Sequence, residues 1–115
     1  MNRKNDNGFG DGIYPRKAPD ILQEAAKDIE QRAKERDLPC ERSMERTVEA
    51  FNALTGHDLT ETEGWLFMAL LKIARATAGS FQQDDLKDCA AYAALALESA
   101  IAEQRIAEIV AGMRL

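Results

Sequence analysis

The stretch "TETEGWLFMALLKIARA", residues 60–76, indicates a buried helix at the centre of an all-α domain. Thr60 and Glu63 have the spacing of a capping box, in which each side chain bonds the other residue's free backbone N–H at the helix start. After this first turn the segment is apolar on every side except at Lys72 and Arg75. Helices that are apolar all round lie in the interior of a fold, so we expect this one to be central.

Three further helices are predicted around this segment. Asp20 marks the start of the first, which ends before Pro39 because the residue preceding a proline is pushed away from the helical conformation. Gly56 is the stop signal of the second helix, and the alanine-rich third begins near Asp84. The expected ranges are about 20–37, 41–55 or 43–55, and 84–100. The last helix either ends there or continues, with or without a bend, to about 113.

The whole pattern predicts an all-α fold. No alternating β-branched run and no hairpin turn between apolar segments competes with the helices. The repeated alanines of the last helix would let a neighbouring helix approach closely, which suits a tight bundle or a subunit interface. We therefore expect a compact bundle of four or five helices, completed by oligomerisation.

Length and charge restrict the classes of protein. The 115 residues suffice for one core, and we expect a flexible arm over residues 1–17 before a single domain at 18–115. The net charge of −5 argues against a protein that coats nucleic acid or an acidic membrane. Weak nucleic-acid binding by the arm stays open as a minor alternative with strongly salt-dependent affinity. No stretch resembles a membrane span or a signal peptide, and Cys40 and Cys89 fit reduced thiols, so a cytoplasmic location is expected.

Three aspartates stand at the mouth of the last helix. Asp84, Asp88 and Tyr92 are spaced four apart and share one face, with Asp85 beside them. Mg²⁺ prefers oxygen ligands, usually a few carboxylates together with water and substrate phosphates. Aspartate is also common at helix starts because it caps free N–H groups and meets the positive end of the helix dipole. Three acids exceed what capping needs, so both the metal site and the cap remain open.

Two more acids and two cations could join this cluster. Glu45 lies with Asn52 along the edge of the apolar stripe of the second helix, although alone it would be an ordinary surface acid. Glu63 already has a role as the capping-box partner. Lys72 and Arg75 are three apart on one face of an apolar helix. Because a buried lysine is costly unless paired, these cations either extend to solvent, pair with the carboxylates or hold an anionic ligand.

Three segments together resemble a known superfamily. They are "FNALTG" (51–56), "LTETEGWLFMALLKIARA" (59–76) and "DDLKDCAAYAALALE" (84–98). Over about residues 20–100 the chain is similar to the small phage and prophage proteins of the MazG-like, all-α NTP pyrophosphohydrolase superfamily. Its members are helical bundles, usually dimers or tetramers. They use Mg²⁺ held by acidic residues to cleave a nucleoside triphosphate into a monophosphate and pyrophosphate.

The resemblance implies roles for particular residues. The superfamily pattern is ExxE on one helix and ExxD at the start of the next. Asp85 stands at the Glu position of the second half and Asp88 at the Asp position. Glu63 occupies the first acidic position, but Leu66 stands three residues on. The missing acid either comes from the preceding helix, where Glu45 and Glu41 are the candidates, or is absent.

The implied site can be stated in full. Its cofactor is Mg²⁺ or Mn²⁺, its substrate is a nucleoside triphosphate, and the active form is a homodimer or homotetramer. The metal ligands would be Glu45, Glu63, Asp84, Asp85 and Asp88, with Glu45 or Glu63 as the general base; Lys72 and Arg75 would hold phosphate, and Tyr92 and Asn52 would contact the base.

A different class of function also fits the sequence. The chain could be a non-catalytic helical interaction module, a small phage accessory protein that binds a host or phage protein. It would dimerise through its alanine-rich helix. In that case the acids are caps and surface residues, and Lys72 and Arg75 form structural ion pairs.

Overall fold

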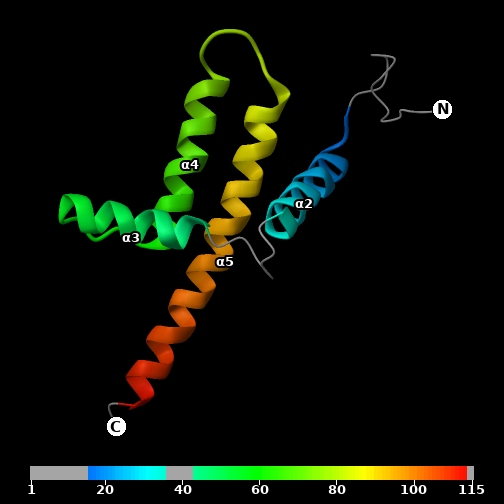
Figure 1. The fold of residues 1–115 in the computed structure, drawn as a ribbon. Coiled ribbons are helices and arrows are strands. Elements are labelled where there is room, and N and C mark those ends of the chain that lie inside the picture. Colours follow the sequence, from blue (N-terminus) through cyan, green and yellow to red (C-terminus); the bar gives the residue numbers. More distant parts are fainter. Residues whose placement is uncertain (1–15, 36–42, 114–115) are drawn as a thin grey trace.

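The computed structural model describes residues 16–35 and 43–113, and within them it contains four α-helices and no strand. The predicted all-α fold is confirmed (Figure 1). Three predictions fall outside the described residues: the arm apart from Arg16 and Lys17, the thiol of Cys40, and the candidate ligand Glu41. The helices are α2 (Ala18–Glu35), α3 (Ser43–Thr55), α4 (Glu61–Ala76) and α5 (Gln83–Met113).

Helices α4 and α5 form an antiparallel hairpin that organises the molecule (Figure 1). The start of α4 has the predicted capping box: Glu63 N donates to Thr60 Oγ1 at 3.1 Å, and Thr60 N donates to Glu63 Oε1 at 2.9 Å. The hairpin turn contains Gly79 with a φ of 72°, in the left-handed region that glycine tolerates best. Residues 101–113 continue the same helix α5 beyond the start of α4.

Helix α3 crosses the beginning of α4 and closes one side of the core. Met44 and Val48 are its buried residues, and they meet α4 at Gly64, where an added methyl group would lie 2.8 Å from Val48 Cγ1. The absence of a side chain at Gly64 therefore lets the two helices approach closely. The buried apolar cluster joins α3, α4 and α5; its members are Met44, Val48, Trp65, Leu95 and Ala96.

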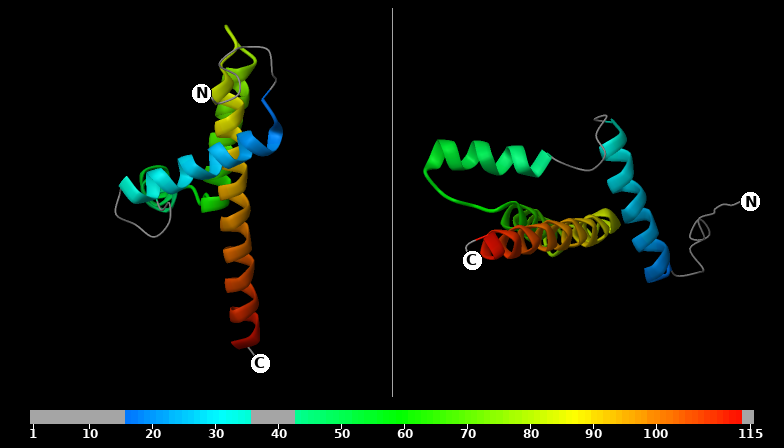
Figure 2. Two further views of the ribbon diagram at one scale, coloured as in Figure 1. Left: turned by 90° about the vertical axis from the view of Figure 1, so that its right-hand side faces the viewer. Right: turned by 90° about the horizontal axis from the view of Figure 1, so that it is seen from below.

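Helix α2 crosses α5 steeply on the other side of the hairpin (Figure 2). Its contact combines a few apolar residues, among them buried Ala25 and Ala33, with ion pairs from Lys87 of α5. Lys87 Nζ lies 3.1 Å from Asp28 and 3.7 Å from Glu24. Arg16, just before α2, also bonds Glu24 and Gln83. Ile29 also packs against the apolar core, so this helix is attached through both apolar contacts and charged groups.

We predicted that α4 would be buried on all sides, but within one chain only one side of it is buried. Trp65 and Ala69 are buried against α5, but the opposite face is open, with Phe67 67% and Leu70 61% exposed. The apolar pattern around α4 gives no information on which neighbour covers each side. Within residues 16–35 and 43–113 of one chain, only three other helices are available to do so. In the described parts of the chain, no helix is long and apolar enough to cross a membrane.

Candidate functional site

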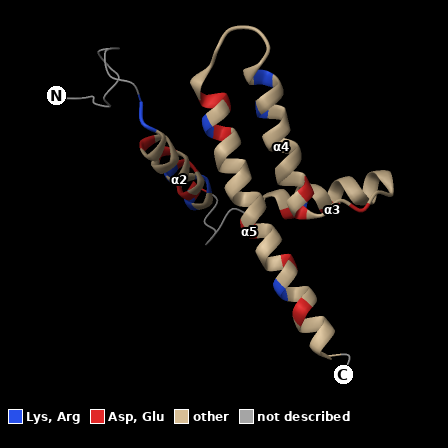
Figure 3. Ribbon diagram, turned by 180° about the vertical axis from the view of Figure 1, so that it is seen from behind, with Lys and Arg blue, Asp and Glu red and all other residues tan. Residues whose placement is uncertain are grey.

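Charged residues of α4 and α5 lie near the hairpin turn, and others lie at the start of α4 and along the later turns of α5 (Figure 3). Residues 64–71 and 89–97, between these groups, carry no charge. Two ion pairs connect the helices near the turn. Lys72 Nζ lies 3.1 Å from Asp88 Oδ2, and Arg75 Nε lies 3.9 Å from Asp85 Oδ1. Both cations pair with the carboxylates, and Arg75, whose side chain is 63% exposed, also extends to solvent. The three-residue spacing in each helix brings both pairs to the same side of the hairpin.

Asp85 is the most unusual acid of this cluster. Its side chain is only 9% exposed, and Arg75 is its one ion-pair partner among the described residues. A separation of 3.9 Å is too long for a hydrogen bond, and no hydrogen bond of this carboxylate occurs in that part of the chain. A buried carboxylate without close donors is costly, and such a group is a candidate for binding a cation or water.

The other two aspartates differ in their surroundings. Asp88 is also largely covered, with 17% of its side chain exposed, and Lys72 satisfies one of its oxygens. The side chain of Asp84 is 79% exposed and lies 3.6 Å from Lys87, one turn further along α5. Asp84 therefore belongs to the surface network between α5 and α2, whereas Asp85 and Asp88 face α4.

The described residues supply two carboxylate ligands for a magnesium ion, but not a complete coordination shell. No group of three or more His, Cys, Asp or Glu in the described ranges is arranged to hold a metal. Mg²⁺, however, is commonly bound by one or two carboxylates while water and substrate phosphates complete its shell. Asp85 and Asp88, three apart on α5, supply two carboxylates on one face. They are the residues of this chain that would hold the ion.

The structure does not bring Glu63 to this cluster within one chain. Nine residues separate Glu63 from Lys72, a rise of about 13.5 Å along α4. Its carboxylate is engaged in the capping box at the far end of the hairpin. Glu45, half-buried in the first turn of α3, lies at that same end because its neighbour Met44 packs on Gly64.

The two predicted base contacts occupy different environments. Both polar atoms of Asn52 are engaged with the backbone of Leu59, through bonds of 2.9 and 3.0 Å that close the turn between α3 and α4. Tyr92 stacks on Trp65 at a centroid distance of 5.7 Å, and the guanidinium of Arg32 lies 6.0 Å from its ring centroid. Tyr92 therefore lines a pocket together with Arg32 and Trp65, whereas Asn52 has a structural role.

Two polar groups near the hairpin were not identified from the sequence. Lys87 connects α5 to α2; burial alone would lower the pKa of Lys87, but its hydrogen bond to Asp28 and the nearby negative charges raise it above 10.5. At the other end, Thr62 donates a 2.9 Å hydrogen bond to buried Ser99. The position of Lys87 between Asp85 and Asp88 in the sequence could have indicated an ion pair. The Thr62–Ser99 bond could not be predicted, because it depends on how α4 and α5 are aligned in the hairpin.

The comparison with known families assigns the chain to a family. Residues 20–100, more than half of the chain, match the family model described as "Domain of unknown function (DUF6378)". The chain belongs to this family. The match ends at residue 100, close to the point where α5 extends beyond α4. No match was found among curated proteins or among solved structures.

Proposed function

We propose that this protein is a Mg²⁺- or Mn²⁺-dependent nucleoside triphosphate pyrophosphohydrolase that acts in the cytoplasm as a homo-oligomer. It would convert a ribo- or deoxyribonucleoside triphosphate into the monophosphate and pyrophosphate. The observation that carries the proposal is Asp85, a buried carboxylate whose cationic partner stays 3.9 Å away. The resemblance to MazG-like pyrophosphohydrolases supports the same residues, Asp85 and Asp88, as metal ligands.

Hydrolysis of a nucleoside triphosphate requires positive charge around the phosphates and a water molecule positioned for attack. A divalent cation at Asp85 and Asp88 would neutralise phosphate charge and make bound water more acidic. Lys72 and Arg75, which now compensate these two aspartates, would then be available to donate hydrogen bonds to phosphate oxygens. Water adds across the α–β phosphoanhydride bond, and a carboxylate accepts its proton.

Two carboxylates are candidates for the general base. Glu45 and Glu63 both lie at the end of the hairpin opposite the aspartates. If Glu63 takes part, it has to come from a second copy of the chain, because about 13.5 Å of helix separates it from Lys72 in its own chain.

The open apolar surfaces support oligomerisation. The outer face of α4 and the last turns of α5 expose many large apolar side chains, more than monomeric proteins usually leave in contact with water. A homodimer or homotetramer would cover them. The exposed residues include Leu66, Phe67, Leu70, Ile73, Ile106, Ile109, Val110 and Met113.

Pyrophosphate release tests the proposed activity. Purified protein is assayed with Mg²⁺ and with Mn²⁺ against the eight common ribo- and deoxyribonucleoside triphosphates. We expect release with at least one nucleotide, and a loss of about 100-fold or more in Asp85→Asn and Asp88→Asn. Asp58→Asn, which changes an exposed acid outside the cluster, serves as the matched control and retains activity. Absence of release with every nucleotide from folded, metal-supplied protein would contradict the proposal.

A second candidate function has its own supporting observation. Asp84, Asp85 and Asp88 each have a cationic partner within the chain, as expected of structural ion pairs in a helical interaction module. Such a module predicts no change in stability on adding Mg²⁺ or Mn²⁺, and it predicts a protein partner for the exposed apolar face of α4. The metal dependence therefore separates the two candidates.

A further inference from the structure

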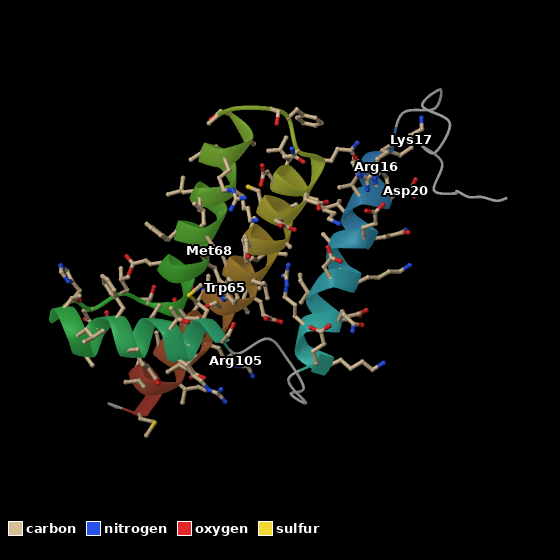
Figure 4. The ribbon with its side chains drawn as sticks, turned by 45° about the horizontal axis from the view of Figure 1, so that its top comes forward. Arg16, Lys17, Asp20, Trp65, Met68 and Arg105 are labelled. Atoms are coloured by element: carbon tan, nitrogen blue, oxygen red, sulfur yellow. The ribbon has the colours of Figure 1, made fainter. Side chains whose placement is uncertain are left out.

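A pocket of about 280 Å³ lies where all four described helices meet. Its walls combine aromatic rings with polar groups: Arg32 comes from α2, Ser43 and Thr47 from α3, Trp65 and Met68 from α4, and Tyr92 from α5. Figure 4 shows Trp65 and Met68 on α4, close to where α3 crosses it. The Trp65 and Tyr92 rings stack on each other, with their centroids 5.7 Å apart and an angle of 23° between them. Because Trp65 is only 4% exposed, Tyr92 is the more accessible aromatic ring of the pocket.

This pocket is in line with the ion pairs along the hairpin. On α5, Tyr92 follows Asp88 by four residues, one helical turn, and Asp88 follows Asp85 by three. On α4, Met68, Lys72 and Arg75 have the same spacing in the opposite direction. The hairpin therefore carries three successive layers: the aromatic pocket, the Lys72–Asp88 pair and the Arg75–Asp85 pair.

The layers match the chemical order of a nucleotide. Met68 and Arg75 are seven residues apart, a rise of about 10.5 Å along α4, which a sugar and its phosphate chain can bridge. The pocket volume of about 280 Å³ is at the low end for small-molecule sites, so it admits a ring system but not a whole nucleotide. Every nucleobase has a π-face that can stack on aromatic residues. The Thr47 hydroxyl donates its hydrogen to the Ser43 carbonyl at 2.8 Å, so its oxygen can still accept a hydrogen bond from the polar edge of a base.

We propose that this pocket holds the nucleobase of the substrate, with the phosphates directed along α4 toward the hairpin turn. The assignment rests on the proposed pyrophosphohydrolase function. It makes Thr47, Trp65 and Tyr92 residues that contact the base, and it places Asp88 nearer the sugar than Asp85. Substrate preference would then depend on the Ser43 and Thr47 side of the pocket.

Fluorescence of Trp65 provides a direct test, since it is the only tryptophan of the chain. Free nucleosides, without phosphates, are titrated into the full-length protein with excitation at the red edge of indole absorption. We expect saturable quenching by at least one nucleoside and none by Mg²⁺-tripolyphosphate alone. Thr47→Phe, which fills the pocket, abolishes the quenching. Glu49→Phe adds the same bulk on α3 outside the pocket and leaves it intact.

The same experiments distinguish an error in the nucleobase-pocket assignment from an error in the proposed pyrophosphohydrolase function. Nucleoside quenching that persists in Thr47→Phe, or no quenching by any nucleoside at millimolar concentration, overturns the assignment. So does an unchanged KM for every hydrolysed nucleotide in Thr47→Phe, where we expect an increase of about tenfold or more. Quenching with the expected variant pattern in a protein that releases no pyrophosphate supports the pocket and rejects only the hydrolase.

Discussion

The two halves of α5 share one apolar face, which is buried in the first half and exposed in the second. In the first half the face is covered by α4 and α2, and Leu95 and Ser99 are 4% and 7% exposed. In the second half Ile106 and Met113 continue the face at helical spacing, but they are 61% and 78% exposed. Helical periodicity therefore identifies which side of α5 is apolar, while the length of α4 decides how much of that side is buried.

The boundary between the halves is marked by polar contacts. Thr62, in the first turn of α4, shares its single hydroxyl hydrogen between Ser99 Oγ and Glu103 Oε1 of α5, each 2.9 Å from Thr62 Oγ1. Beyond Glu103 every described residue of α5 is exposed. This second half is part of the surface that the proposed homo-oligomer would cover.

Truncation of matched residues on the two halves should have the largest effect and the clearest contrast. Leu95→Ala removes a buried side chain and should lower the free energy of unfolding by about 2–5 kcal/mol. Ile106→Ala, on the same face, should change the stability of the isolated chain by no more than about 0.5 kcal/mol. Urea unfolding at low protein concentration measures both. Equal losses in the two variants would mean that the second half is buried as well.

The ion pair in the covered half should show the cost of an unpaired charge. Lys72→Met leaves Asp88 without its cation and should cost about 2–3 kcal/mol, somewhat below the value for fully buried pairs because each side chain keeps some exposure. The double variant Lys72→Met/Asp88→Leu should recover most of that loss. A double-mutant cycle by chemical denaturation measures the coupling. A single variant as stable as the wild type would show that the pair contributes nothing.

The contact between α3 and α4 should tolerate no added methyl group. Gly64→Ala would place Cβ against Met44 and 2.8 Å from Val48 Cγ1, so α3 has to shift. We expect a loss of about 1–2 kcal/mol, although alanine is the better helix former. Gly112→Ala, where the added methyl group meets nothing within 4 Å, is the control in the exposed half and should be neutral or stabilising. Thermal unfolding of both variants checks the difference.

The attachment of α2 should depend on pH through Lys87. Because the folded-state pKa of Lys87 is raised above 10.5, its contribution to stability is fully present below pH 10.5. That contribution is lost as the pH rises through the folded-state value. We expect a small decrease in the free energy of unfolding across this range, and Lys87→Met should remove this component. An identical alkaline decrease in the variant would assign it to other groups.

Local signals in the sequence predicted the helices well. Stop and start signals predicted α3 to end at Thr55 and α4 to begin after Thr60, as the structure has it. The spacing of Lys72 and Arg75 predicted that both cations share a face, and both pair with carboxylates. These features depend on neighbours within one or two turns, which a single sequence contains.

The parts that depend on several helices at once were not predictable. The pocket draws its walls from four helices, so no local pattern contains it. Asn52 has the helical position of a site residue, but the turn that it closes engages both of its polar atoms. The open outer face of α4 likewise follows from the number of helices available, since its apolar composition is the same on every side.

The most direct measurement is the effect of metal and nucleotide on the stability of wild-type protein and Asp85→Asn. At a ligand concentration 100 times its dissociation constant, binding should raise the free energy of unfolding by about 2.7 kcal/mol. We predict this increase for the wild type with Mn²⁺ and a non-hydrolysable nucleoside triphosphate, and none for Asp85→Asn. Equal responses in the two proteins, or none in either, would contradict the assignment of Asp85 as a ligand and favour structural ion pairs at this end of the hairpin.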